Sequence, residues 1–96
     1  AKVEAVMVEY KRFIALAATV TRHTGFAVPA LDVDQVWHLH LIFTTSYWDD
    51  MCRDVLGKPI YHHPYTLTDS SGYQATMLRY KNEFGLTPPE AIWGKF

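Results

Sequence analysis

The 96-residue chain contains a single cysteine, Cys52, and this scarcity limits its chemistry. One thiol can form no internal disulfide and no metal site built from several thiolates. A domain without disulfides is typical of a reducing compartment, so we expect a cytoplasmic protein. Because Cys52 falls in the middle of an expected helix, beside Trp48 and Val55, we interpret it as a buried, unreactive thiol.

The sequence also lacks an excess of charge of either sign. Nine basic and ten acidic residues give a formal charge of -1, which supplies no strong positive field for a nucleic-acid backbone or an anionic membrane. The apolar run over residues 39–48 is shorter than a membrane span. The N-terminal segment carries charge every few residues, unlike a signal peptide. We therefore expect no nucleic acid and no membrane as partners.

Large apolar side chains, in contrast, are abundant. Hydrophobic residues make up 49% of the chain and aromatic residues 15%, which is typical of a globular domain with a core of large rings. The length suits one domain over residues 1–96.

Apolar residues spaced three and four apart predict three main helices, over residues 2–22, 32–56 and 71–84. Asp32 stands where the N-cap of the second helix is expected, and Gly57 follows its last residue. The polar face of the first helix is expected to carry its charged residues: Lys2, Glu4, Glu9, Lys11 and Arg12.

A shorter helix is expected near the C-terminal end. The sequence TPPE, residues 87–90, has the form of a capping box with proline at the first helical position, and Ile92 and Trp93 follow it. No segment shows the alternation of a strand. The predicted fold is all-α: a small bundle of three main helices with a central apolar helix, a histidine-containing loop over residues 57–70 and a short C-terminal helix.

Two histidines interrupt the apolar second helix in the stretch VWHLH. Residues on a regular helix advance by about 100° each, so His38 and His40 should point to nearly opposite sides. His40 shares the inward face with Trp37 and Tyr47, and we expect a hydrogen-bonded core imidazole with Tyr47 as a further polar group. His38 shares its flank with Asp34, four residues earlier.

Some apolar side chains of the second helix fall on its outward side, where a solvated helix carries polar groups. These side chains can be buried in two ways. Either the loop over residues 57–70 packs on them, or a protein partner does, which includes a second copy of the chain. If the loop covers this side, His62 and His63 approach His38. The residues to be covered are Leu39, Ile42 and Phe43.

The resulting cluster supports two interpretations. In the first, Asp34, His38 and one of His62 or His63 bind a divalent metal ion, zinc above all, because carboxylate oxygen and imidazole nitrogen are zinc ligands. Since His62 and His63 are adjacent in an extended segment, only one of them should reach the ion. In the second, the same groups form a hydrogen-bonded clasp without a metal. The residues alone favour the clasp, because the HExxH signature is absent.

Three segments are the most specific features of the sequence: DVDQVWHLHLIFTTSYWDDMC, LGKPIYHHP and RYKNEFGLTPPEAIW. In these segments, from about Val28 to Trp93, the chain resembles the glycine-rich domain-containing protein-like family of plants and bacteria. The glycine-rich tail of the plant members has no counterpart here. The family's D-x-x-W-H-x-H core, later tyrosine and histidine pair match Asp34, Trp37, His38, His40, Tyr47, His62 and His63.

The resemblance places the metal and clasp interpretations on equal terms, because the family motif contains both histidines of the second helix. Two functions are expected: a metal-binding helical domain, or a noncatalytic interaction or structural module with a polar histidine network. No nucleophile elbow, phosphate loop or dinucleotide fingerprint is present. No catalytic residue is assigned, and enzyme activity stays open.

Overall fold

A computed structural model describes residues 2–20, 27–62 and 70–94 of the chain. These residues form helices without any strand, which confirms the all-α prediction. None of the described helices has the length and apolar character that a membrane span needs. The elements are α1 (Lys2–Ala17), α2 (Leu31–Ile42), the π-helix η1 (Thr45–Leu56), α3 (Ser70–Phe84) and α4 (Glu90–Trp93).

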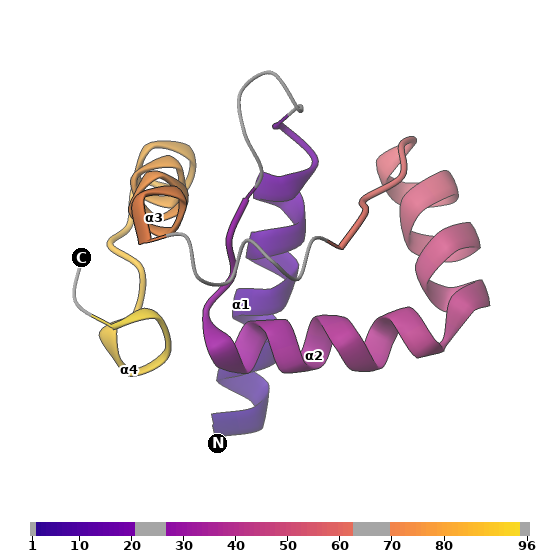
Figure 1. Ribbon diagram of the computed structural model, residues 1–96, viewed down its shortest axis with the longest axis horizontal. Helices are drawn as coiled ribbons and strands as arrows, with labels where there is room; N and C mark the ends of the chain where they lie inside the picture. Colours follow the sequence, from indigo (N-terminus) through magenta and orange to yellow (C-terminus); the bar gives the residue numbers. More distant parts are fainter. Residues whose placement is uncertain (1, 21–26, 63–69, 95–96) are drawn as a thin grey trace.

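The predicted continuous helix over residues 32–56 is wrong, because the structure divides it into α2 and η1. Phe43 leaves helical geometry with φ -84° and ψ 75°, and η1 then turns steeply away from α2 (Figure 1). In one straight helix Trp37 and Tyr47 would lie about 15 Å apart along the axis. After the bend, Trp37 Nε1 donates a hydrogen bond to Tyr47 Oη over 2.7 Å. The bend therefore allows both aromatic side chains to enter one core.

Helix starts also differ from the predictions. The N-cap of α2 is Ala30, which forms no side-chain cap, while Asp32 lies one residue inside the helix and pairs with Lys2 at 3.3 Å. Similarly, Pro89 is the N-cap of α4, again without a side-chain cap, so the expected TPPE capping box does not form. The fixed φ of proline suits a helix start by itself, and α4 forms where the sequence predicts it.

Helix ends follow the sequence more closely, except for α1. Gly57 and Gly85 adopt positive φ, 73° and 67°, directly after η1 and α3, a backbone conformation that glycine adopts at little cost. The first helix ends at Ala17 instead of residue 22. There the Thr19 hydroxyl donates to the Leu16 carbonyl over 2.7 Å, which satisfies one of the free carbonyls of the helix end.

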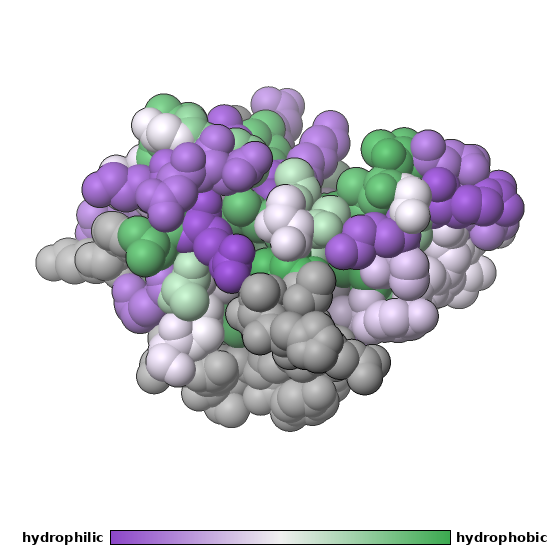
Figure 2. Space-filling model, turned by 90° about the horizontal axis from the view of Figure 1, so that it is seen from above, coloured by the Kyte–Doolittle hydropathy of each residue, from purple (hydrophilic) through white to green (hydrophobic). Residues whose placement is uncertain are grey.

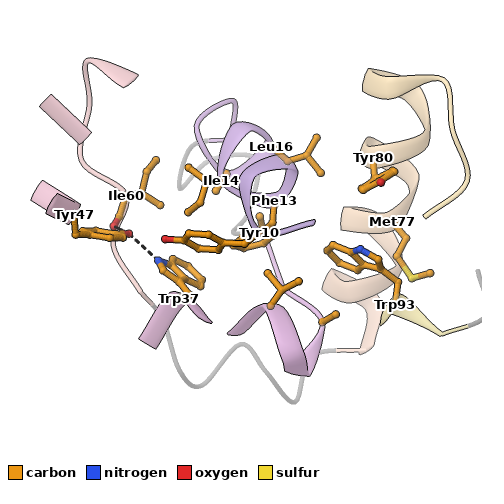
Figure 3. Packing of buried hydrophobic residues seen from close by; sticks show 14 of the residues in the cluster. Tyr10, Phe13, Ile14, Leu16, Trp37, Tyr47, Ile60, Met77, Tyr80 and Trp93 are labelled. Carbon is orange, nitrogen blue, oxygen red and sulfur yellow. Dashed lines mark hydrogen bonds between the residues drawn. The ribbon is translucent and has the colours of Figure 1, made fainter. Parts of the chain in front are cut away.

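The core lies where α2 crosses α1. As predicted, the second helical segment is central, since α2 contacts α1, η1 and α4, while α1 also contacts α3. Phe13 of α1 is fully buried and lies between two indole rings, with ring centroids 5.0 Å from Trp37 and 6.5 Å from Trp93 (Figure 3). Aromatic rings at these separations stabilise a core beyond the area that they bury.

The sequence predicts Glu9 on the polar face of the first helix, but this prediction is wrong because Glu9 is only 2% exposed. Trp93 Nε1 donates to its Oε1, and Arg12 Nη1 donates to its Oε2, each over 2.9 Å. Arg12 also donates to Tyr80 Oη over 2.7 Å. A buried carboxylate is tolerated when its charge is paired and hydrogen bonded, so Glu9 joins α1 to α4 and, through Arg12, to α3.

Candidate metal centre

A buried carboxylate at the start of α2 is the centre of the candidate site. Asp34 is 5% exposed. Its Oδ1 lies 2.8 Å from His62 Nε2, and its Oδ2 lies 3.6 Å from His38 Nε2. One ligand atom from each residue can be chosen so that all three lie within 4.8 Å of one another. Asp34, His38 and His62 are called the Asp–His–His triad below.

Helix geometry places the first two members of the triad. Asp34 and His38 are four residues apart in α2 and therefore share one face. The sequence predicts this pair correctly.

His62 reaches the triad because the chain returns after η1. Two residues before it, the buried Ile60 accepts a hydrogen bond from Tyr47 Oη over 2.6 Å. Lys58 Nζ donates to the Ala18 carbonyl over 2.8 Å, which fixes the returning segment to the end of α1. The imidazole then lies 4.5 Å, between ring centroids, from Trp37. Two anchors and one aromatic contact thus hold His62 beside Asp34.

The prediction that one member of the adjacent pair approaches Asp34 and His38 is met by His62. His63 lies outside the described residues. The rings of His38 and His62 are 4.4 Å apart between centroids, so both imidazoles border the same carboxylate.

Burial is uneven across the triad. The side chains of Asp34 and His62 are 7% and 10% exposed, whereas that of His38 is 54% exposed. Among the described residues, the two histidines are the only groups that pair with the Asp34 carboxylate. An ionised carboxylate is costly to bury without positive charge nearby. Here a metal cation or a protonated imidazole can supply that charge, and the exposed side of the cluster lies at His38.

His40 points away from the triad, as the helical geometry predicts. Its Nδ1 shares a 2.6 Å hydrogen bond with Tyr10 Oη, and its Nε2 shares a 2.9 Å hydrogen bond with Ser46 Oγ. The imidazole is half-buried and links α1 to the residues just after the bend. Tyr47, the other polar group of the prediction, is fully buried, and its burial raises its pKa to about 12. Tyr47 acts on the site indirectly, through Ile60.

Lowering the pH is expected to destabilise the protein in part through His40. Burial lowers the pKa of His40 in the folded state, so the unfolded chain, with a histidine pKa of about 6.5, takes up a proton at higher pH. The free energy of unfolding should therefore fall as the pH drops through about 6.5, and the loss should level off below the folded-state pKa of His40. Urea unfolding in a chelator, from pH 7.5 to 5, should show a weaker pH dependence for His40→Gln than for the wild type. The same pH dependence of the free energy of unfolding in His40→Gln and the wild type would contradict the contribution of His40.

The outward apolar side chains of α2 and its bend stay exposed, although the sequence predicts that they are covered. Leu39 is 58% exposed, Ile42 74% and Phe43 62%. The expected docking of the loop on this side is wrong for residues 57–62, because His62 meets Asp34 while these three side chains stay exposed.

The sequence predicts Trp37 only as a core residue, but its side chain also forms one wall of the site. Its ring contacts His62, and its indole N–H holds Tyr47, whose hydroxyl holds Ile60. The available signal was its position beside His38 in the W-H-x-H motif.

Comparison with known proteins agrees with the resemblance found in the sequence. A family model described as UCP032817-like matches residues 1–86. "Glycine-rich domain-containing protein 1" of Arabidopsis thaliana is 35% identical over 69 residues, and "Glycine-rich domain-containing protein 2" of the same plant is 31% identical over 67 residues. Each alignment covers 62% of this chain but only 8% of the relative's length. No solved structure matches the chain significantly.

Proposed function

This chain belongs to the UCP032817-like family, and we propose that it is a small cytoplasmic helical domain, extending over residues 1–96, that binds one divalent metal ion. The ligands are Asp34, His38 and His62, and the metal is zinc. His63, the other member of the predicted ligand set, is the alternative to His62 at the same position.

The observation that carries this proposal is the close approach of three metal-ligating atoms around a buried carboxylate. Zinc binds carboxylate oxygen and imidazole nitrogen at about 2.0–2.2 Å, so ligand atoms around one ion lie a little over 3 Å apart, and the present 2.8–4.8 Å spacing requires only small side-chain movements. The cation would also neutralise Asp34, whose described partners are only the two imidazoles.

The number of ligands bears on the chemistry. Closed structural zinc sites use four protein ligands, whereas catalytic sites use three and leave one position for water or substrate. The triad supplies three, and its exposed side lies at His38, which is 54% exposed. An open position there would admit water or a small anionic ligand.

Metal analysis of the purified protein tests the proposal. The protein is purified without a metal-affinity resin, incubated with zinc and then desalted. We expect it to retain about one equivalent of zinc, measured by elemental mass spectrometry. Retention should fall in acidic buffer, because protons compete for the imidazole nitrogens. A fully folded protein that retains no zinc, iron, copper or other divalent ion would contradict the proposal.

A second candidate is a noncatalytic interaction module that docks a protein partner, or a second copy, on its exposed apolar corner. The supporting observation is the exposure of Leu39, Ile42 and Phe43, since apolar groups gathered at a surface mark interaction sites. A metal-free folded protein that self-associates, and that Ile42→Asp renders monomeric in sedimentation velocity, would favour this candidate over the first.

A further inference from the structure

An apolar depression lined by described residues lies away from the triad. It is a groove of about 590 Å³ between α1, α2 and η1, and none of the triad residues lines it. Figure 2 shows hydrophobic side chains on the inner side of the right-hand lobe, which η1 forms, and hydrophilic side chains at its outer end. The principal apolar lining residues are Met7, Ile14, Val36, Leu39, Met51 and Leu56.

The bend after α2 creates this groove. Because η1 turns away from α2 at Phe43, the two helices form two walls and α1 forms a third (Figure 1). The volume falls within the 300–1,000 Å³ typical of small-molecule sites. A concavity with three walls suits a compact ligand better than a flat partner surface. Leu39, one of the lining residues, is 58% exposed and therefore accessible to such a ligand.

The charged groups of the groove define the ligand further. Lys11 is the one charged side chain among the lining residues, and it forms no ion pair with any described residue. The other polar side chains in the wall, Tyr10 and His40, are already hydrogen bonded to each other, and His40 also to Ser46. The complementary molecule is therefore apolar along most of its length and carries one negative charge.

We propose that the groove binds a single-chain anionic amphiphile, a free long-chain carboxylate. The hydrocarbon chain packs against the apolar lining between α1, α2 and η1, and the carboxylate pairs with the Lys11 ammonium at the rim. The proposal does not depend on the metal site, because the two sites share no residue.

A chain-length series tests the apolar half of the proposal. Calorimetric titration with saturated monocarboxylates below their micelle concentrations should saturate at one equivalent. The affinity should rise about fourfold for each added methylene until the groove is filled, and then level off. Leu39→Asp should weaken dodecanoate binding at least about tenfold. The matched control is Leu78→Asp on α3, which is also half-exposed but outside the groove and should bind like the wild type.

The charged half is tested by reversing Lys11. Lys11→Glu should weaken dodecanoate binding about tenfold, since an attraction becomes a repulsion, while dodecanol binding stays unchanged. The control Lys81→Glu makes the same change of net charge on α3, which contributes no residue to the groove, and should leave both affinities as in the wild type. Vesicles of an anionic phospholipid should compete with dodecanoate poorly. Strong competition by vesicles would indicate that the groove binds a membrane surface instead of a free carboxylate.

Three results would overturn the proposal. The first is the absence of saturable binding for every carboxylate in the series. The second is equal loss of affinity in Leu39→Asp and Leu78→Asp, which would show nonspecific adsorption. The third is a wild-type dimer in sedimentation velocity that Leu39→Asp dissociates, because the groove would then be an interface between copies of the chain. If Leu39→Asp does not fold by circular dichroism, the chain-length series and Lys11→Glu decide the outcome alone.

Discussion

Zinc at about a hundredfold excess over its dissociation constant is expected to raise the free energy of unfolding of the wild-type protein by about 2.7 kcal/mol, because an ion that binds only the folded state stabilises it by mass action. For a domain of this size, the melting temperature should rise by roughly 11–22 °C. Calorimetric melting with zinc and with chelator measures the difference directly.

His62→Ala should remove most of this effect. The variant loses one of three ligands, and since even residues that only support a ligand are worth about 10–100-fold in metal affinity, we expect the dissociation constant to rise at least about a hundredfold. At the same zinc concentration the stabilisation then falls to about 0.4 kcal/mol. The matched control is His40→Gln, which removes an imidazole from the same helix region but outside the triad, and its stabilisation by zinc should equal that of the wild type.

The same measurements distinguish a metal site from a metal-free clasp. In a clasp, the 2.8 Å hydrogen bond between His62 and Asp34 contributes equally with and without zinc, so His62→Ala lowers the melting temperature by the same amount in both buffers. In a metal site, the loss is larger when zinc is present. Equal shifts in the two buffers, or equal responses of His62→Ala and His40→Gln to zinc, would exclude the metal site.

The helices of this fold could be predicted from periodicity, but the break between α2 and η1 could not. The stretch from His40 to Tyr47 contains no glycine or proline, the residues that usually reveal a helix end. The bend is instead stabilised by contacts that the local sequence does not show, above all the hydrogen bonds of Tyr47 with Trp37 and Ile60. Tertiary contacts therefore determine where the second helix stops.

The candidate site divides in the same way. The pairing of Asp34 with His38 follows from their spacing in α2, and so does the separate direction of His40. Which face of the returning segment meets Asp34 depends on how Ile60 is anchored, and helical periodicity does not describe an irregular segment of this kind. The burial of Glu9 could not be predicted either. Its partner Trp93 lies 84 residues away, and nothing near Glu9 in the sequence indicates this contact.

Trp37→Ala is expected to lower the free energy of unfolding by about 3–5 kcal/mol, the range for removing a large aromatic side chain from a core. Trp37 is 4% exposed and contacts the rings of Phe13 and His62. The truncation also removes the hydrogen bond that the indole donates to Tyr47 (Figure 3). Because Tyr47 positions Ile60 ahead of His62, the variant should bind zinc more weakly than the wild type even under conditions where it remains folded.

Two further variants separate the ring from its N–H group. Trp37→Phe keeps an aromatic ring but removes the donor to Tyr47, and should cost about 1–3 kcal/mol, since a buried acceptor loses its partner and some volume is lost. Leu78→Ala truncates a half-exposed side chain on α3 and should change stability by less than about 0.5 kcal/mol. Denaturant unfolding of the three variants measures their free energies of unfolding and so gives the order of their stabilities. If Trp37→Ala unfolds like Leu78→Ala, the indole does not hold α2, η1 and the segment leading to His62 together.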